Sequence, residues 1–120
     1  MVSFVIVSHS AKLADGVIDL ARMSAKECAM LPAGGMEDGS YGTSFDMISE
    51  AISKAYSKDG VIVLADMGSA VMTTEMVIES LNLPKIKLLE CPIVSGAVSG
   101  SVLSDAGSTF EEIVNELEQL

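Results

Sequence analysis

Short apolar runs alternate with segments of helical spacing along this chain. Runs with the composition of buried strands occupy residues 2–7, 28–33, 61–65 and 86–89. Between them, apolar side chains recur every three to four positions, as at Leu13, Val17 and Leu20 or at Met72 and Met76. The pattern predicts strands and helices in alternation, with two helices after the last strand.

Capping residues mark where several of these helices begin. Thr43 or Ser44 is suited to the N-cap of the second helix. The segment 93–108 is rich in Gly, Ser and Ala, and we predict a helix there although each glycine costs about 1 kcal/mol relative to alanine. Ser108 and Thr109 are each followed three residues later by a glutamate, which is the capping-box pattern for the last helix.

The element order predicts a single α/β domain over residues 1–120. Short connections and right-handed crossovers favour a four-stranded parallel, doubly wound sheet with helices on both faces. The expected strand order is 2-1-3-4. This order makes the first and third strands neighbours at the switch point, where the loops after residues 7 and 65 meet beside the glycine-rich loop that starts at Gly34.

Charge and hydropathy narrow the classes of partner. The formal net charge is −10, which repels nucleic acid and anionic membranes. Hydrophobic residues make up 49% of the chain, yet no apolar run reaches the roughly 20 residues of a membrane span. We expect a cytoplasmic protein, because the first strand follows Met1 directly. We also expect a homodimer, with the third helix and the small-residue segment 93–108 as interface candidates.

Few side chains are available to hold metals or phosphate. Cys28 and Cys91 lie in or next to apolar runs without metal-ligand spacing, so we expect reduced thiols and no metal site. Arg22 is the only arginine. Any bound phosphoryl group must therefore rely mainly on backbone amides and helix N-termini.

The only histidine, His9, follows the first strand within the sequence Ser8-His9-Ser10. A solvated loop histidine is the simpler interpretation, but this position favours a nucleophile or phosphoryl acceptor. Asp66 follows the third strand and is suited to orient the imidazole. It is also suited to cap the helix that follows it.

Small residues around these turns are candidates to hold a phosphoryl group. Two of them, Gly68 and Ser69, open the third helix, and Ser10 opens the first. Gly34 and Gly35 offer amides from the neighbouring loop. The later glycines of that loop, at positions 39 and 42, are read as turn geometry.

Motifs of other α/β families are missing. The chain contains neither GxGxxG nor GxxxxGK[ST] nor GxSxG. An acidic pair, as in receiver domains, does not follow the first strand. An Arg-His-Gly start, as in phosphohistidine mutases and phosphatases, is absent as well.

Several strings together resemble one family. VIVSHS, PAGG followed by DGSYGTS, LADMGSA and CPIVSGAVSG occur in this order. They resemble the phosphotransfer subunit of the phosphoenolpyruvate-dependent dihydroxyacetone kinase, which is similar in fold to the mannose-family IIA domains of the sugar phosphotransferase system (PTS). The resemblance spans essentially the whole chain.

The resemblance implies a phosphohistidine carrier. His9 would accept a phosphoryl group from the carrier protein HPr and pass it to ADP in the nucleotide-binding subunit of the kinase. Asp66 would support the histidine, and ADP, ATP and magnesium would belong to the partner subunit. The family is typically dimeric.

Two alternatives remain open at this point. One is a sugar-transport IIA domain that donates to a IIB partner through the same histidine chemistry. The other is a regulatory or scaffold domain without turnover.

Overall fold

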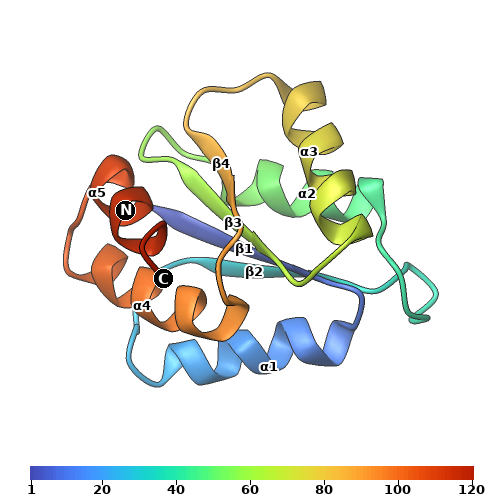
Figure 1. The fold of residues 1–120 in the computed structure, drawn as a ribbon, viewed down its shortest axis with the longest axis horizontal. Helices are drawn as coiled ribbons and strands as arrows, with labels where there is room; N and C mark the ends of the chain where they lie inside the picture. Colours follow the sequence, from blue (N-terminus) through green and yellow to red (C-terminus); the bar gives the residue numbers. More distant parts are fainter.

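The apolar runs form one parallel sheet. The computed structural model describes residues 1–120 and places the four strands side by side in the order β2-β1-β3-β4 (Figure 1). Each neighbouring pair is parallel. The strands are β1 (Ser3–Ser8), β2 (Met30–Gly34), β3 (Val61–Ala65) and β4 (Ile86–Leu89). The predicted fold class and strand order are confirmed.

Helices cover both faces of this sheet. One face carries α1 (Ala11–Arg22), α4 (Ile93–Asp105) and α5 (Phe110–Leu117). The opposite face carries α2 (Phe45–Ala55) and α3 (Ser69–Leu81) (Figure 1). None of the helices is both long and apolar enough to cross a bilayer.

The alternation of side chains along β1 produces the two cores. Phe4 and Ile6 join the core under α1, α4 and α5. Val5 and Val7 join the core under α2 and α3. All four side chains are fully buried, which is why this central strand is apolar throughout instead of alternating with polar residues.

Glycines in α4 let that helix approach the sheet closely. A Cβ added at Gly100 would lie 2.6 Å from the ring of Phe4, and one at Gly96 would lie 2.6 Å from Cys91 Sγ. The predicted helix is confirmed. Its small-residue face is buried within the chain, while Val94 and Val102 on the same helix are exposed, so a subunit interface here stays a prediction.

The second strand differs from the sequence prediction. It begins at Met30 instead of Cys28 and ends at Gly34 instead of Ala33, so it runs through Pro32. Proline donates no backbone hydrogen bond, but β2 is an edge strand and one side of it needs no partner.

In two helices, fewer of the regularly spaced apolar side chains are buried than the sequence pattern predicts. Leu13 and Leu20 of α1 are exposed, and the face that packs on the sheet is narrower, comprising Ala14, Val17 and Ala21. Met72 and Met76 of α3 are also exposed.

The structure shows which residues cap the starts of two helices. Ser44, not Thr43, caps α2 and accepts from the Met47 backbone N–H. Thr109 and Glu112 form the predicted capping box of α5.

Candidate active site

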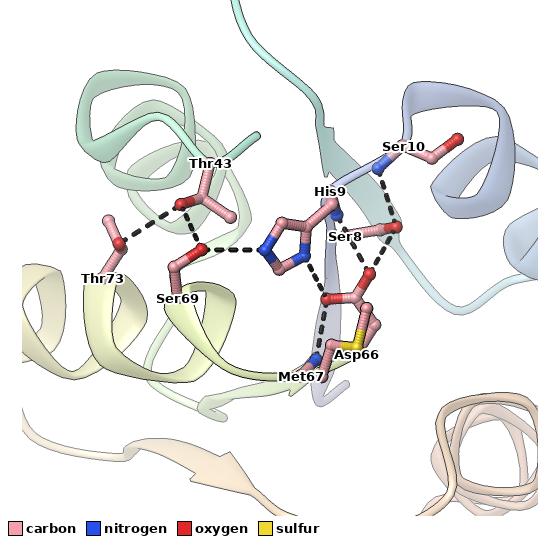
Figure 2. Close-up of polar contacts among 8 residues, drawn as sticks. All are labelled: Ser8, His9, Ser10, Thr43, Asp66, Met67, Ser69 and Thr73. Carbon is pink, nitrogen blue, oxygen red and sulfur yellow. Dashed lines mark hydrogen bonds and ion pairs between the residues drawn. The ribbon is translucent and has the colours of Figure 1, made fainter. Parts of the chain in front are cut away.

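The site lies where β1 and β3 end beside each other. His9 follows the last residue of β1, and Asp66 follows the last residue of β3. The Asp66 backbone N–H donates to the Val7 carbonyl at 3.1 Å, which continues the sheet pairing into the two turns. Figure 2 shows the imidazole of His9 directed between the Asp66 carboxylate and the start of α3.

The carboxylate of Asp66 is held by four donors. Its Oδ1 lies 3.0 Å from His9 Nδ1 and accepts from the Met67 backbone N–H at 2.8 Å. Its Oδ2 accepts from the Ser8 hydroxyl at 2.9 Å and from the His9 backbone N–H at 3.0 Å (Figure 2). With both oxygens occupied, the carboxylate has a fixed orientation toward the ring.

These contacts keep Asp66 ionised. Burial disfavours its charged form, but the hydrogen bonds from His9, Ser8 and Met67 outweigh this effect, and the pKa of Asp66 lies below its ordinary value. An ionised carboxylate only accepts hydrogen bonds, so His9 Nδ1 carries a proton, and in the neutral imidazole Nε2 then carries the lone pair.

A hydroxyl group contacts that lone pair. The Oγ of Ser69, the first residue of α3, lies 2.8 Å from His9 Nε2. Thr43 Oγ1 donates to Ser69 Oγ at 3.2 Å, and Thr73 Oγ1 lies 3.4 Å from Thr43 Oγ1. The reactive nitrogen thus faces a group of hydroxyls from two segments (Figure 2).

Free backbone amides lie at the start of α3. Gly68 occupies the N-cap position with φ +49°, and no side chain caps the helix. The N–H groups of Gly68 and Ser69 take no part in the turn and cap hydrogen bonds. No heavy atom beyond the chain neighbours lies within 4 Å of the position of a Gly68 Cβ. Such a helix start favours an anion.

The alternative role of Asp66 as a helix cap is not realised. Gly68 occupies the N-cap position of α3, two residues beyond Asp66. The carboxylate instead turns back toward β1, where it holds Ser8 and His9.

The other residues proposed for phosphate lie close by but are engaged in the fold. Ser10 caps α1 by accepting from the Leu13 N–H, and its own N–H donates to Ser8 Oγ. The Gly35 N–H donates to the Ser8 carbonyl. Gly34 has no space for a side chain, because its Cβ would lie 2.6 Å from Ala11 Cα.

Sequence reasoning did not find the roles of Thr43 and Thr73. Thr43 was considered only as a helix cap, and Thr73 carried no motif. A loop position next to the cap gives no periodic signal, so only the folded loop shows that Thr43 lies opposite His9. No group of three or more His, Cys, Asp or Glu side chains is arranged to hold a metal ion.

The family follows from a comparison with known sequences. Residues 3–114 match the sequence model of the EIIA-man family, described as the PTS system fructose IIA component. The chain belongs to this family. The resemblance drawn from the sequence motifs is therefore confirmed at the level of the family.

Several curated relatives within this family are subunits of dihydroxyacetone kinases. The PTS-dependent dihydroxyacetone kinase, phosphotransferase subunit DhaM of Lactococcus lactis is 38% identical over 97% of this chain and 93% of its own length. The PEP-dependent dihydroxyacetone kinase 2, phosphoryl donor subunit DhaM of Listeria innocua is 31% identical, over 98% and 97%. The corresponding Escherichia coli subunit is 34% identical, and the chain spans 26% of its length.

Solved structures share the fold. The crystal structure of the unknown function protein EF1359 superposes with a TM-score of 0.89 at 26% identity, covering 98% of this chain and 93% of that one. The mannose/sorbose specific IIA subunit from Enterococcus faecalis superposes with a TM-score of 0.58 at 15% identity, covering 98% and 86%.

Proposed function

We propose that this chain is a phosphohistidine carrier, the phosphoryl donor subunit of a phosphoenolpyruvate-dependent dihydroxyacetone kinase. The observation that carries the proposal is the setting of His9: its Nδ1 contacts the Asp66 carboxylate, and its Nε2 contacts the hydroxyl of Ser69, the first residue of α3. The names of the full-length relatives support the kinase branch.

The proposed reaction needs no proton transfer within this chain. The Nε2 lone pair of His9 attacks the phosphorus of a phosphohistidine on the donor. The donor's N–P bond breaks as the new N–P bond forms, and the electron pair returns to the donor imidazole. The Nδ1 proton of His9 stays in place, so the phosphorylated ring is cationic and pairs with the Asp66 carboxylate 3.0 Å away.

The negative charge of the phosphoryl group needs donors, and the start of α3 supplies them. The Ser69 hydroxyl already contacts Nε2, and we propose that the uncapped N–H groups of Gly68 and Ser69 beside it bind the phosphoryl oxygens. Each charge–dipole contribution at an exposed helix start is about 0.3–1 kcal/mol, so several must act together.

The donor and acceptor are part of the proposal. HPr supplies the phosphoryl group, and ADP held by the nucleotide-binding subunit of the kinase receives it. This subunit itself binds no nucleotide and no metal and works in the cytoplasm as a homodimer.

A transfer assay separates this proposal from the sugar-transport alternative. The chain is first phosphorylated by HPr and purified, then mixed with the ADP-loaded nucleotide-binding subunit of a dihydroxyacetone kinase. We expect ATP to form as the label leaves His9. Transfer to a mannose-type IIB protein instead, with no ATP formed, would assign the chain to sugar transport.

A further inference from the structure

Three hydroxyl groups lead away from the reactive nitrogen of His9. They belong to Ser69 and Thr73, one turn apart on α3, and to Thr43, on the loop between β2 and α2. The successive distances are 2.8 Å from Nε2 to Ser69, 3.2 Å from Ser69 to Thr43 and 3.4 Å from Thr43 to Thr73 (Figure 2).

The position of each proton gives this row of three hydroxyl groups a donor-to-acceptor direction. In the neutral imidazole, with Nδ1 donating to Asp66, Nε2 accepts, and the Ser69 hydroxyl donates to it. Thr43 donates to Ser69 Oγ. Because the single hydroxyl proton of Thr43 is thereby used, Thr73 is the donor between the two threonines. All three protons are directed toward the nucleophilic nitrogen, and each bond strengthens the next.

The backbone holds Thr43 in this position. The N–H of Gly42, just before it, donates to the His9 carbonyl at 3.0 Å. Ser44, just after it, is buried, caps α2 and donates to Glu37. The glycine-rich loop is therefore fastened to His9 on one side of Thr43 and to α2 on the other.

A phosphoryl group on Nε2 would change the acceptor of the Ser69 hydroxyl proton. At 2.8 Å from Nε2, the Ser69 hydroxyl occupies the place that the phosphorus would take, so it must turn aside when the N–P bond forms. A phosphoryl oxygen then becomes the nearest acceptor for its proton. Thr43, which donates to Ser69, decides whether that proton stays directed at the histidine side.

We propose that Thr43 is a positioning residue of the phosphotransfer. It acts through Ser69, directing the serine hydroxyl onto Nε2 of unphosphorylated His9 and onto the phosphoryl oxygens afterwards. This inference rests on the proposed phosphotransfer at His9. It gives the glycine-rich loop a role in that reaction beyond its turn geometry.

The test compares variants that differ by one hydroxyl. Thr43→Val removes the hydroxyl at nearly constant volume, and Thr43→Ser restores it. Thr74→Val is the matched control, because Thr74 lies beside Thr73 on α3 and its buried Oγ1 has no hydrogen-bond partner. Thr43→Ala is a second hydroxyl-free variant, and thermal melting confirms that each protein is folded.

Nitrogen-15 NMR gives a readout that loss of folding stability would not move. His9 is the only histidine, so the imidazole nitrogens of the protein give a single pair of signals. Thr43→Val should shift the Nε2 signal toward that of a free lone pair. Thr43→Ser and Thr74→Val should leave it at the wild-type position.

Phosphorylation by HPr gives the second readout. Because a phosphoryl oxygen is charged and Nε2 is neutral, the Ser69 hydrogen bond that Thr43 supports is stronger in the phosphorylated state, and Thr43→Val should lower the phosphorylation equilibrium constant by about three- to tenfold. Because Thr43 acts through Ser69, Thr43→Val should add nothing in a Ser69→Ala background. Thr43→Ser should recover most of the loss.

The possible results separate the two proposals. A wild-type chain that HPr cannot phosphorylate overturns the proposed function, while the NMR comparison still tests Thr43. A phosphorylated wild type together with a Thr43→Val variant that matches it in both readouts overturns the role of Thr43. Additive losses from Thr43→Val and Ser69→Ala would also contradict action through the serine.

Discussion

At the scale of single residues, one carboxylate determines the chemistry of the site. Asp66 holds the His9 ring by Nδ1 and the His9 backbone by its N–H, and Ser8 and Met67 fix the carboxylate itself. The fixed proton on Nδ1 leaves the lone pair on Nε2. In the proposed reaction, this tautomer makes Nε2 the nucleophile.

Replacing Asp66 by Asn should slow phosphorylation strongly. The variant keeps the shape but loses the charge that stabilises the cationic phosphorylated ring. A hydrogen bond to a charged group contributes about 1.5–3 kcal/mol, so a loss of roughly 10- to 100-fold is expected. Rapid-quench measurement of labelling by phosphorylated HPr checks this. Wild-type kinetics in the variant would reduce Asp66 to a structural residue.

Asp66 should also contribute to acid unfolding. Its pKa is lowered in the folded protein, with burial opposing and the hydrogen bonds from His9, Ser8 and Met67 producing the shift. The folded state therefore gains stability above the ordinary pKa of 3.8 and loses it as the pH falls through the lower folded value.

Urea unfolding at pH 7 and near pH 3 tests this sign. The difference in free energy of unfolding between wild type and Asp66→Asn should be largest at neutral pH and shrink in acid. A difference that grows in acid would contradict the assignment.

At the scale of elements, the close approach of β2 to α1 shapes the site. A Cβ at Gly34 would meet Ala11 Cα at 2.6 Å and the Ser10 carbonyl at 2.8 Å, and both atoms are backbone. Gly34→Ala should therefore destabilise the protein by about 1–3 kcal/mol through overpacking.

Gly16 provides the matched control for this substitution. It lies inside α1, and nothing is within 4 Å of the position of its Cβ. Gly16→Ala should stabilise the protein by about 0.5–1 kcal/mol. Thermal melting of both variants checks the pair, and equal effects of the two substitutions would show that the tight contact at Gly34 is not what matters.

The sequence predicted the helices, the strands and their order more accurately than it predicted which side chains each element buries. Strand order and the pairing of His9 with Asp66 were predictable, because each residue directly follows a strand and parallel strands end at one edge. The start of β2 at Met30 instead of Cys28 was not, because the apolar run extends beyond the residues that pair with β1. Thr43 was missed because a loop has no periodicity to place its side chains.

At the scale of the whole molecule, apolar surface remains uncovered. Met67, Met72 and Met76 at the start and on the exposed side of α3 have 65%, 67% and 60% of their surface exposed. These methionines make α3 the first interface candidate to test, and the exposed Val94 and Val102 keep α4 as the second.

Light scattering at micromolar concentration tests the homodimer. We expect twice the chain mass of 12.5 kDa. Met72→Lys should lower the measured mass if α3 forms the interface. A wild-type mass of one chain would contradict the dimer.

The most direct test of the central claim is phosphoryl transfer to the only histidine. The chain is incubated with phosphoenolpyruvate, enzyme I and HPr, and the acid-labile phosphate is counted and mapped. We predict one phosphoryl group per chain on His9 Nε2 and none on a folded His9→Ala variant. Label on His9→Ala, or none on the wild type beside fully phosphorylated HPr, would contradict the account.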